Sequence, residues 1–124
     1  MQKRSKSGLQ RLIDATGYSL RGFQAAWRSE VAFRQELLLI MILLPAAFWL
    51  GTDMTQRAVL MLSSLLILAV ELINSAIESI VDRIGPEAHP LSGQAKNMGS
   101  AAVLISLIAT AVVWGLVAWE RWMV

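Results

Sequence analysis

The sequence contains no cysteine, and only one histidine and one tyrosine. Without cysteine there can be no disulfide framework, no thiolate metal site and no cysteine nucleophile. The single histidine, His89, has no second histidine or cysteine to complete a metal site of that kind, so we expect a loop residue rather than a metal ligand. A GxxxxGK[ST] phosphate loop and the HRD and DFG motifs of protein kinases are missing as well. Thiol chemistry and the common soluble kinase sites are therefore excluded.

Charged residues are also scarce. They make up 16% of the 124 residues, whereas hydrophobic residues make up 56% and the mean hydropathy is +0.55. This apolar content exceeds that of a typical soluble domain of this size, so we predict a single small all-α integral-membrane domain. We expect no cleavable signal, because the basic start is followed by amphipathic sequence rather than by an apolar signal core.

Three apolar segments are long enough to cross a bilayer. We predict membrane spans over residues 31–51, 56–82 and 97–120. A brief turn separates the first two, and a polar loop rich in glycine and proline, over residues 83–96, separates the last two. The chain is therefore expected to pass through the membrane three times.

Two further features concern helix packing. Residues 8–29 carry apolar side chains at spacings of three and four, which is typical of an amphipathic helix lying at the membrane interface. The third predicted span opens with the small residues 99–102, and small residues let helix backbones approach closely. We therefore expect that end of the span to pack tightly on a neighbouring helix.

The basic residues are distributed unevenly. Seven of the eleven lysines and arginines lie between Lys3 and Arg34, and Arg83 and Lys96 flank the second predicted loop. The positive-inside rule then puts the N-terminus and this loop in the cytoplasm. Such an asymmetry suits an anionic membrane surface, and we expect no nucleic-acid partner.

A polar stripe interrupts the second predicted span. Its members are Glu71, Asn74, Glu78 and Asp82. Their spacing of i, i+3, i+7 and i+11 brings all four to one face of a helix. Ionised carboxylates in hydrocarbon are costly and usually mark function, and neighbouring glutamates repel each other unless a cation or protons lie between them. The residues alone therefore predict a membrane-embedded metal or proton site.

Three interpretations of this stripe remain open at the level of the residues. Polar side chains can simply join packed helices, including those of a larger membrane complex for which this chain is a structural partner. Glu71 and Glu78 could instead relay protons or cations in a transport subunit. In a third interpretation, one carboxylate is the general base on a lipid headgroup, others bind a metal, and Lys96 faces an anionic co-substrate.

A longer pattern narrows this choice. Residues 71–82, ELINSAIESIVD, resemble the signature of the small bacterial integral-membrane diacylglycerol kinases, as do residues 17–22, 30–36, 81–85 and 98–103 in their order and spacing. The resemblance implies transfer of the ATP γ-phosphoryl group to the free hydroxyl of diacylglycerol, giving phosphatidic acid. It also implies Mg²⁺ and a homotrimer in the bacterial inner membrane. The related prenol kinases share the central motif, so undecaprenol is the alternative substrate.

The same resemblance implies roles for individual residues. Glu71 would be the general base on the lipid hydroxyl, and Glu30 and Glu78 would hold the metal that bridges the nucleotide phosphates. Lys96 would neutralise charge on these phosphates. Further positions near ATP are Arg11, Tyr18, Glu87, His89 and Asn97; positions on the lipid side are Arg11, Ser100 and Trp114; supporting positions are Asn74 and Asp82.

Asn97 departs from the pattern of the family, which usually has an acidic residue after the lysine. Asparagine keeps an acceptor oxygen but loses the charge that could pair with Lys96 or with magnesium-bound water. We therefore expect that the fold is retained and that catalysis or metal affinity is weakened.

Overall fold

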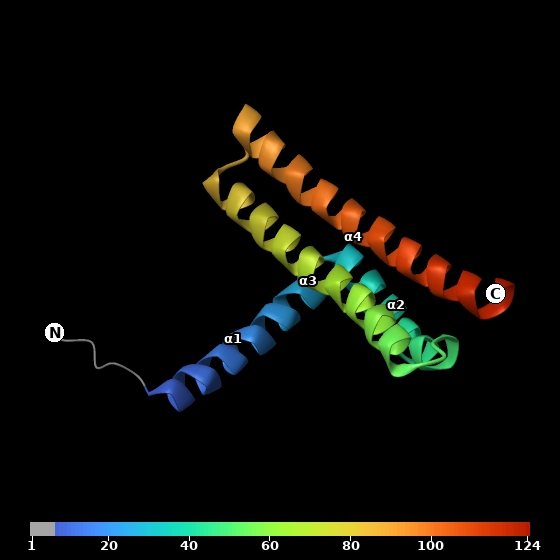
Figure 1. Ribbon diagram of the computed structural model, residues 1–124. Coiled ribbons are helices and arrows are strands. Elements are labelled where there is room, and N and C mark those ends of the chain that lie inside the picture. The colour runs from blue at the N-terminus through green and yellow to red at the C-terminus, as the bar shows by residue number, and fades with distance from the viewer. Residues whose placement is uncertain (1–6) are drawn as a thin grey trace.

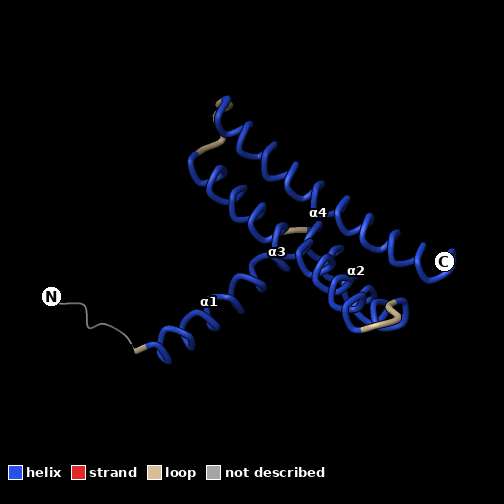
Figure 2. Tube along the Cα trace, in the orientation of Figure 1, coloured by secondary structure: helices blue, strands red, loops and turns tan. Residues whose placement is uncertain are grey.

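The computed structural model describes residues 7–124 and contains four helices in that range (Figure 1). They are α1 (Gly8–Ser29), α2 (Val31–Leu50), α3 (Met54–Ile84) and α4 (Pro90–Met123). Short loops join them, and the described part contains no strand (Figure 2). The predicted all-α class is therefore confirmed. Lys3, Arg4 and Lys6, which contribute to the basic N-terminal segment, lie outside the described residues.

Helices α2, α3 and α4 are each long and apolar enough to cross a membrane, as predicted. α3 packs against both α2 and α4, which contact each other only slightly. The α1–α2 junction lies beside the middle of α3, and α1 points away from the other helices (Figure 1). α3 has 31 residues, about 46 Å at 1.5 Å per residue, which exceeds the ~30 Å thickness of the bilayer hydrocarbon. One helix can therefore carry side chains inside the membrane and in the water beside it.

The loop between α3 and α4 is shorter than the predicted loop over residues 83–96. α3 ends at Ile84 because Gly85 follows with a φ of 150°, a conformation that favours glycine. α4 already begins at Pro90, where the fixed φ of proline suits the first helical position. The His89 Nδ1 atom also accepts a hydrogen bond from the Leu91 N–H at 3.1 Å, which caps the helix. Lys96 and Asn97 consequently lie on a helix rather than in or beside a loop.

Hydrogen bonds join α3 to α4 within their apolar stretches. Thr110 Oγ1 donates to the Ser63 carbonyl oxygen at 3.0 Å. Trp114 Nε1 donates to Ser64 Oγ at 3.2 Å, and Ser64 is fully buried. Because hydrocarbon offers no competing partner, such contacts help hold membrane helices together.

A small apolar core lies near the α2–α3 turn. Ala47, Leu50 and Leu60 are buried there against Val117 of α4, with Trp114 packed at its edge. Most other large apolar side chains on the three long helices are exposed. Three helices side by side enclose little interior, so these faces are available to lipid or to other helices.

The last turn of α4 closes over the C-terminal end of α2. Arg121 Nη1 donates to the carbonyl oxygens of Trp49 at 3.0 Å and Leu50 at 3.1 Å. Its guanidinium also lies over the rings of Trp49 and Trp122. We call Arg121, Trp49 and Trp122 the aromatic clasp. It satisfies carbonyl groups that have no partner within α2.

Candidate functional site

Four carboxylates gather where the α1–α2 junction meets α3. Glu71 is buried on α3, with 4% of its surface exposed. Its carboxyl group interacts directly with that of Glu36 on α2, and the charges of Glu30 and Glu78 also act on it. Asp82, the outermost residue of the polar stripe, is exposed near the end of α3. The predicted stripe therefore exists, and it runs from a buried inner end to an exposed outer end.

Glu30 joins this group because the chain is not helical there. It lies between α1 and α2 with extended backbone angles, φ −120° and ψ 110°. Its N–H donates to the Ala26 carbonyl oxygen at 2.9 Å, which ends α1. Arg34 Nη1 donates to the Trp27 carbonyl oxygen at 3.0 Å and joins the two helices across the break. The break thus brings a carboxylate from the α1–α2 junction towards the stripe on α3.

The donor set suits a divalent cation that is shared with phosphates. Among residues 7–124 no group of three or more aspartate, glutamate and histidine side chains is close enough to hold a metal by itself. Magnesium at phosphate sites needs only one or two carboxylates, because phosphates and water supply the remaining oxygens. Glu30 and Glu78 both act on Glu71, so a cation between them would relieve the repulsion among these carboxylates. The chemistry of these carboxylates is therefore compatible with magnesium when nucleotide supplies further oxygens.

A cavity of about 390 Å³ opens between α1 and α3 beside Glu30. Phe23 and Ala26 of α1 line one wall, and Ser75 and Ser79 of α3 line the other. The Ser75 hydroxyl oxygen is buried and has no hydrogen-bond partner among the described residues, whereas Ser79 Oγ donates to the Ser75 carbonyl oxygen at 2.9 Å. The cavity is largely apolar with a few polar groups, as pockets for small molecules commonly are.

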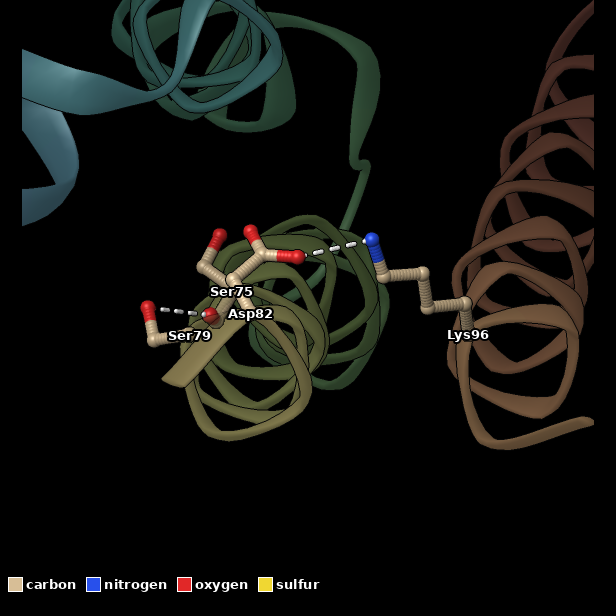
Figure 3. Close-up of polar contacts among 4 residues, drawn as sticks. All are labelled: Ser75, Ser79, Asp82 and Lys96. Atoms are coloured by element: carbon tan, nitrogen blue, oxygen red, sulfur yellow. Dashed lines mark hydrogen bonds and ion pairs between the residues drawn. The ribbon is translucent and has the colours of Figure 1, made fainter. Parts of the chain in front are cut away.

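A second cavity, of about 610 Å³, lies at the α3–α4 loop. Glu87, His89, Lys96 and Asp82 all line it, so the structure brings four of the predicted site residues together. Lys96 Nζ donates to Asp82 Oδ1 at 2.9 Å, and this ion pair bridges α4 and α3 (Figure 3). The Glu78 charge also acts on Lys96. The lysine thus lies at the outer end of the carboxylate stripe.

Other predicted residues lie away from these two cavities. Arg11 and Tyr18 are exposed on α1, where the Arg21 guanidinium lies 5.3 Å from the Tyr18 ring centroid. Ser100 is exposed on α4, and Trp114 binds Ser64 near the core. None of these four residues lines either cavity.

Asn97 is exposed on α4 directly after Lys96. Asn74, by contrast, is buried on α3, and its Oδ1 atom has no hydrogen-bond partner among residues 7–124. Of the two predicted supporting residues, Asn74 thus belongs to the buried end of the stripe and Asp82 to the exposed end.

The residues predicted for the site did not include Glu36, which the structure places beside Glu71. It is a carboxylate within the α2 stretch that is apolar enough to span a membrane, which is itself a signal of function. Its Oε2 atom is buried without a hydrogen-bond partner in the described part of the chain. What the sequence could not show is that this side chain meets Glu71, because the two residues lie on different helices.

Comparisons with known proteins show the family of this chain. The model of the family "Prokaryotic diacylglycerol kinase" matches residues 17–118. The chain belongs to the prokaryotic diacylglycerol kinase family. A diacylglycerol kinase of Escherichia coli K12 is 48% identical over 115 residues, which cover 93% of this chain and 94% of the relative. The diacylglycerol kinase of Pseudomonas aeruginosa is 50% identical over 114 residues, 92% and 93% of the two chains.

The diacylglycerol kinase of Haemophilus influenzae is 49% identical over 109 residues, covering 88% of this chain and 92% of the relative. The predicted resemblance is therefore confirmed over most of the chain. Membership of this family makes the protein an ATP-dependent lipid kinase. The prenol kinase, transport-subunit and structural-partner interpretations are not favoured.

Proposed function

We propose that this lipid kinase phosphorylates diacylglycerol with Glu71 as the general base, at a Mg-ATP site on the cytoplasmic side of the bacterial inner membrane. The observation that carries the proposal is the gradient along α3, from the buried Glu71 to the exposed Asp82. A lipid hydroxyl reaches the site from the membrane, whereas ATP reaches it from water. The two ends of the stripe match these two approaches.

Glu71 is the candidate base because it lies at the buried end. Its carboxylate accepts the proton of the diacylglycerol hydroxyl as the hydroxyl oxygen attacks the γ-phosphorus. The bond from that phosphorus to the bridging oxygen of ADP breaks, and the products are phosphatidic acid and ADP. Glu36, which interacts with Glu71, helps to hold the base in position.

Glu30 and Glu78 would hold the magnesium ion together with the nucleotide phosphates. When bound, the ion neutralises charge on the β- and γ-phosphates. Lys96 adds a positive charge from the outer end, where the exposed Asp82 carboxylate now pairs with it. Phosphoryl transfer depends mainly on such positioning and charge neutralisation, so the site needs no phosphate loop.

The cavity at the α3–α4 loop is the candidate nucleotide site. Glu87 and His89 line it with Lys96, which supports their predicted places near ATP. Arg11 and Tyr18 would reach the nucleotide from α1, which we propose lies in the membrane interface. Apolar residues of α1, including Leu9, Leu12 and Phe23, are exposed and available to that interface.

We also propose that the working unit is a homotrimer. Most large apolar side chains on α4 are exposed, Ser100 is exposed as well, and Trp114 hydrogen-bonds to Ser64 within one chain. Packing of α3 and α4 faces between copies would cover this surface and let neighbouring chains contribute lipid contacts to one site.

The decisive experiment is phosphate transfer from labelled ATP in mixed micelles with magnesium. Diacylglycerol and undecaprenol are offered separately, and Glu71→Gln, which keeps the size of the side chain, is the control. Formation of labelled phosphatidic acid by the parent enzyme, at a rate that falls by at least about 100-fold in Glu71→Gln, supports the proposal. Product from undecaprenol alone would overturn the assignment of diacylglycerol as the substrate. A fully active Glu71→Gln enzyme would overturn the role of Glu71.

A further inference from the structure

The backbone of α4 comes close to the carboxylate stripe at Gly99. This residue is buried on α4 and faces Asn74 of α3. A Cβ atom added at position 99 would overlap Asn74 Oδ1 and lie 3.2 Å from Asn74 Cγ. A Cβ atom added at Gly115, on the same helix, would meet nothing within 4 Å. Position 99 therefore needs glycine for a specific contact, whereas position 115 does not.

The contact acts on one functional group, the Asn74 amide. A hydrogen of the Gly99 Cα atom stands where the Cβ would be, so it points at Asn74 Oδ1. Contacts of this Cα–H···O kind recur where helices pack closely. Oδ1 has no conventional hydrogen-bond partner among residues 7–124. The amide oxygen is therefore turned towards α4, and its NH2 group is the part left to donate elsewhere.

Asn74 lies between two residues to which the proposed function gives roles. It is three residues after Glu71 and four before Glu78, so the three side chains are neighbours on one face of α3. Carboxylate oxygens of these two neighbours are possible acceptors for an NH2 group there, as are phosphate oxygens once nucleotide is bound. The rotation of this amide therefore decides whether donors or an acceptor face the reacting groups.

We propose that Gly99 is a positioning residue for the kinase reaction, which acts by keeping the Asn74 amide turned so that its NH2 group faces the site. The inference rests on the proposed roles of Glu71 and Glu78. It assigns Gly99 no contact with substrate or metal; its part is to leave room for one orientation of Asn74.

The geometry also predicts how the enzyme responds to a methyl group at position 99. The atom that would be overlapped is the far end of the Asn74 side chain, whereas Asn74 Cβ is 3.8 Å away. Rotating that amide relieves the overlap more cheaply than moving α4 away from α3. Gly99→Ala should therefore keep the fold and lose the amide orientation.

The test is a double-mutant cycle on the intact enzyme in mixed micelles. The variants are Gly99→Ala, Asn74→Ala and the two combined, with Gly115→Ala as the matched control on the same helix. We expect Gly99→Ala to lower kcat by about 10- to 100-fold, in line with the cost of a misplaced group, with KM for diacylglycerol changed by less than about twofold. Gly115→Ala should keep kcat within about twofold of the parent enzyme.

Non-additivity decides the mechanism. If Gly99 acts through Asn74, the combined variant is no slower than Asn74→Ala alone, because the group that the new methyl displaces is already gone. Losses that multiply in the combined variant would overturn the proposal, as would full activity of Gly99→Ala.

The melting temperatures of the four variants are measured as well, so that the contact is tested even if a variant loses activity because it fails to fold. If Gly99→Ala lowers the melting temperature and adding Asn74→Ala restores it, the contact is supported. If the melting temperature is lowered and not restored, the contact is overturned. A parent enzyme without kinase activity would refute the proposed catalytic roles, and the stability cycle would then still decide whether residues 74 and 99 are coupled.

Discussion

Lys96 on α4 and Asp82 on α3 form an ion pair of 2.9 Å at the outer end of the carboxylate stripe. Both side chains are substantially exposed, 44% for Lys96 and 69% for Asp82. Exposed pairs contribute little to stability because water screens both charges. The lysine can therefore exchange its carboxylate partner for a phosphate group without a large loss of stability.

We predict that Lys96→Met and Asp82→Asn have opposite consequences at the nucleotide site. Lys96→Met removes the charge that meets the phosphates and should raise KM for ATP by about 10-fold or more. Asp82→Asn frees the lysine and should leave KM for ATP unchanged or lower. Initial rates over a range of Mg-ATP concentrations measure both. If the asparagine variant loses ATP affinity as severely as the methionine variant, the carboxylate has a direct role in nucleotide binding.

Asn97→Asp is expected to increase activity. The new carboxylate would stand beside Lys96 on an exposed turn of α4, where it can pair with magnesium-bound water or with the lysine. We expect turnover to rise by several fold, or the same turnover to be reached at lower magnesium concentration, because peripheral groups commonly change metal affinity by about 10-fold or more. Turnover is measured at several magnesium concentrations, with Asn97→Ala as the control. No gain at any concentration would contradict the prediction.

Shared sites in a trimer predict complementation between inactive chains. Glu71→Gln and Glu30→Gln should each abolish most activity on their own. If one site combines groups from different chains, mixed trimers will contain some sites with both glutamates intact. Activity should then recover partially after the two purified variants are mixed, dissociated and reassembled. Absence of recovery at every mixing ratio would assign both glutamates to the same chain, as they lie in the structure.

The aromatic clasp should stabilise the fold without taking part in catalysis. Arg121→Met loses two hydrogen bonds to carbonyl oxygens and the contacts with Trp49 and Trp122. We expect a loss of about 1–3 kcal/mol in the free energy of unfolding. Arg83→Met, at an exposed position near the end of α3, is the matched control and should change it by less than about 0.5 kcal/mol. Denaturant titration in micelles measures the difference.

Equal stability of these two variants would show that the clasp contributes nothing. Activity per folded molecule should be unchanged in Arg121→Met, since Arg121 belongs to the end of α4 opposite to Lys96.

The absence of native cysteine allows a direct test of orientation. Single cysteines are introduced as Ser7→Cys before α1 and as Thr52→Cys in the α2–α3 turn. If the N-terminus is cytoplasmic, a membrane-impermeant maleimide added to intact spheroplasts labels only the Thr52→Cys variant. Both variants should be labelled after the membrane is disrupted. Labelling of the Ser7→Cys variant alone in intact spheroplasts would reverse the orientation.

Much of this molecule follows from local sequence. Hydrophobic run length predicted the three apolar helices, since crossing a bilayer requires a minimum length of apolar residues. The spacing from Glu71 to Asp82 predicted a one-sided polar stripe, because helical periodicity is set by the backbone. The long motif around this stripe predicted the family that the comparisons confirmed.

The α3–α4 loop shows where such reasoning stopped short. Its glycines and prolines predicted a break but not its extent. The His89 side chain caps α4 and Pro90 begins it, so the helix takes up part of the predicted loop. The cap depends on the local geometry of the chain around His89, which composition does not reveal.

The relationships that make up the site were decided by tertiary structure. Glu36 meets Glu71, and Gly99 meets Asn74, only because α2 and α4 pack on α3 at particular rotations and heights. Trp114 likewise meets Ser64 through the packing of α4 on α3. The sequence by itself determined which faces of each helix are polar, small or apolar, since that depends on residue order along one backbone. Which faces meet depends on side-chain packing between helices far apart in the chain, and only the folded structure decided it.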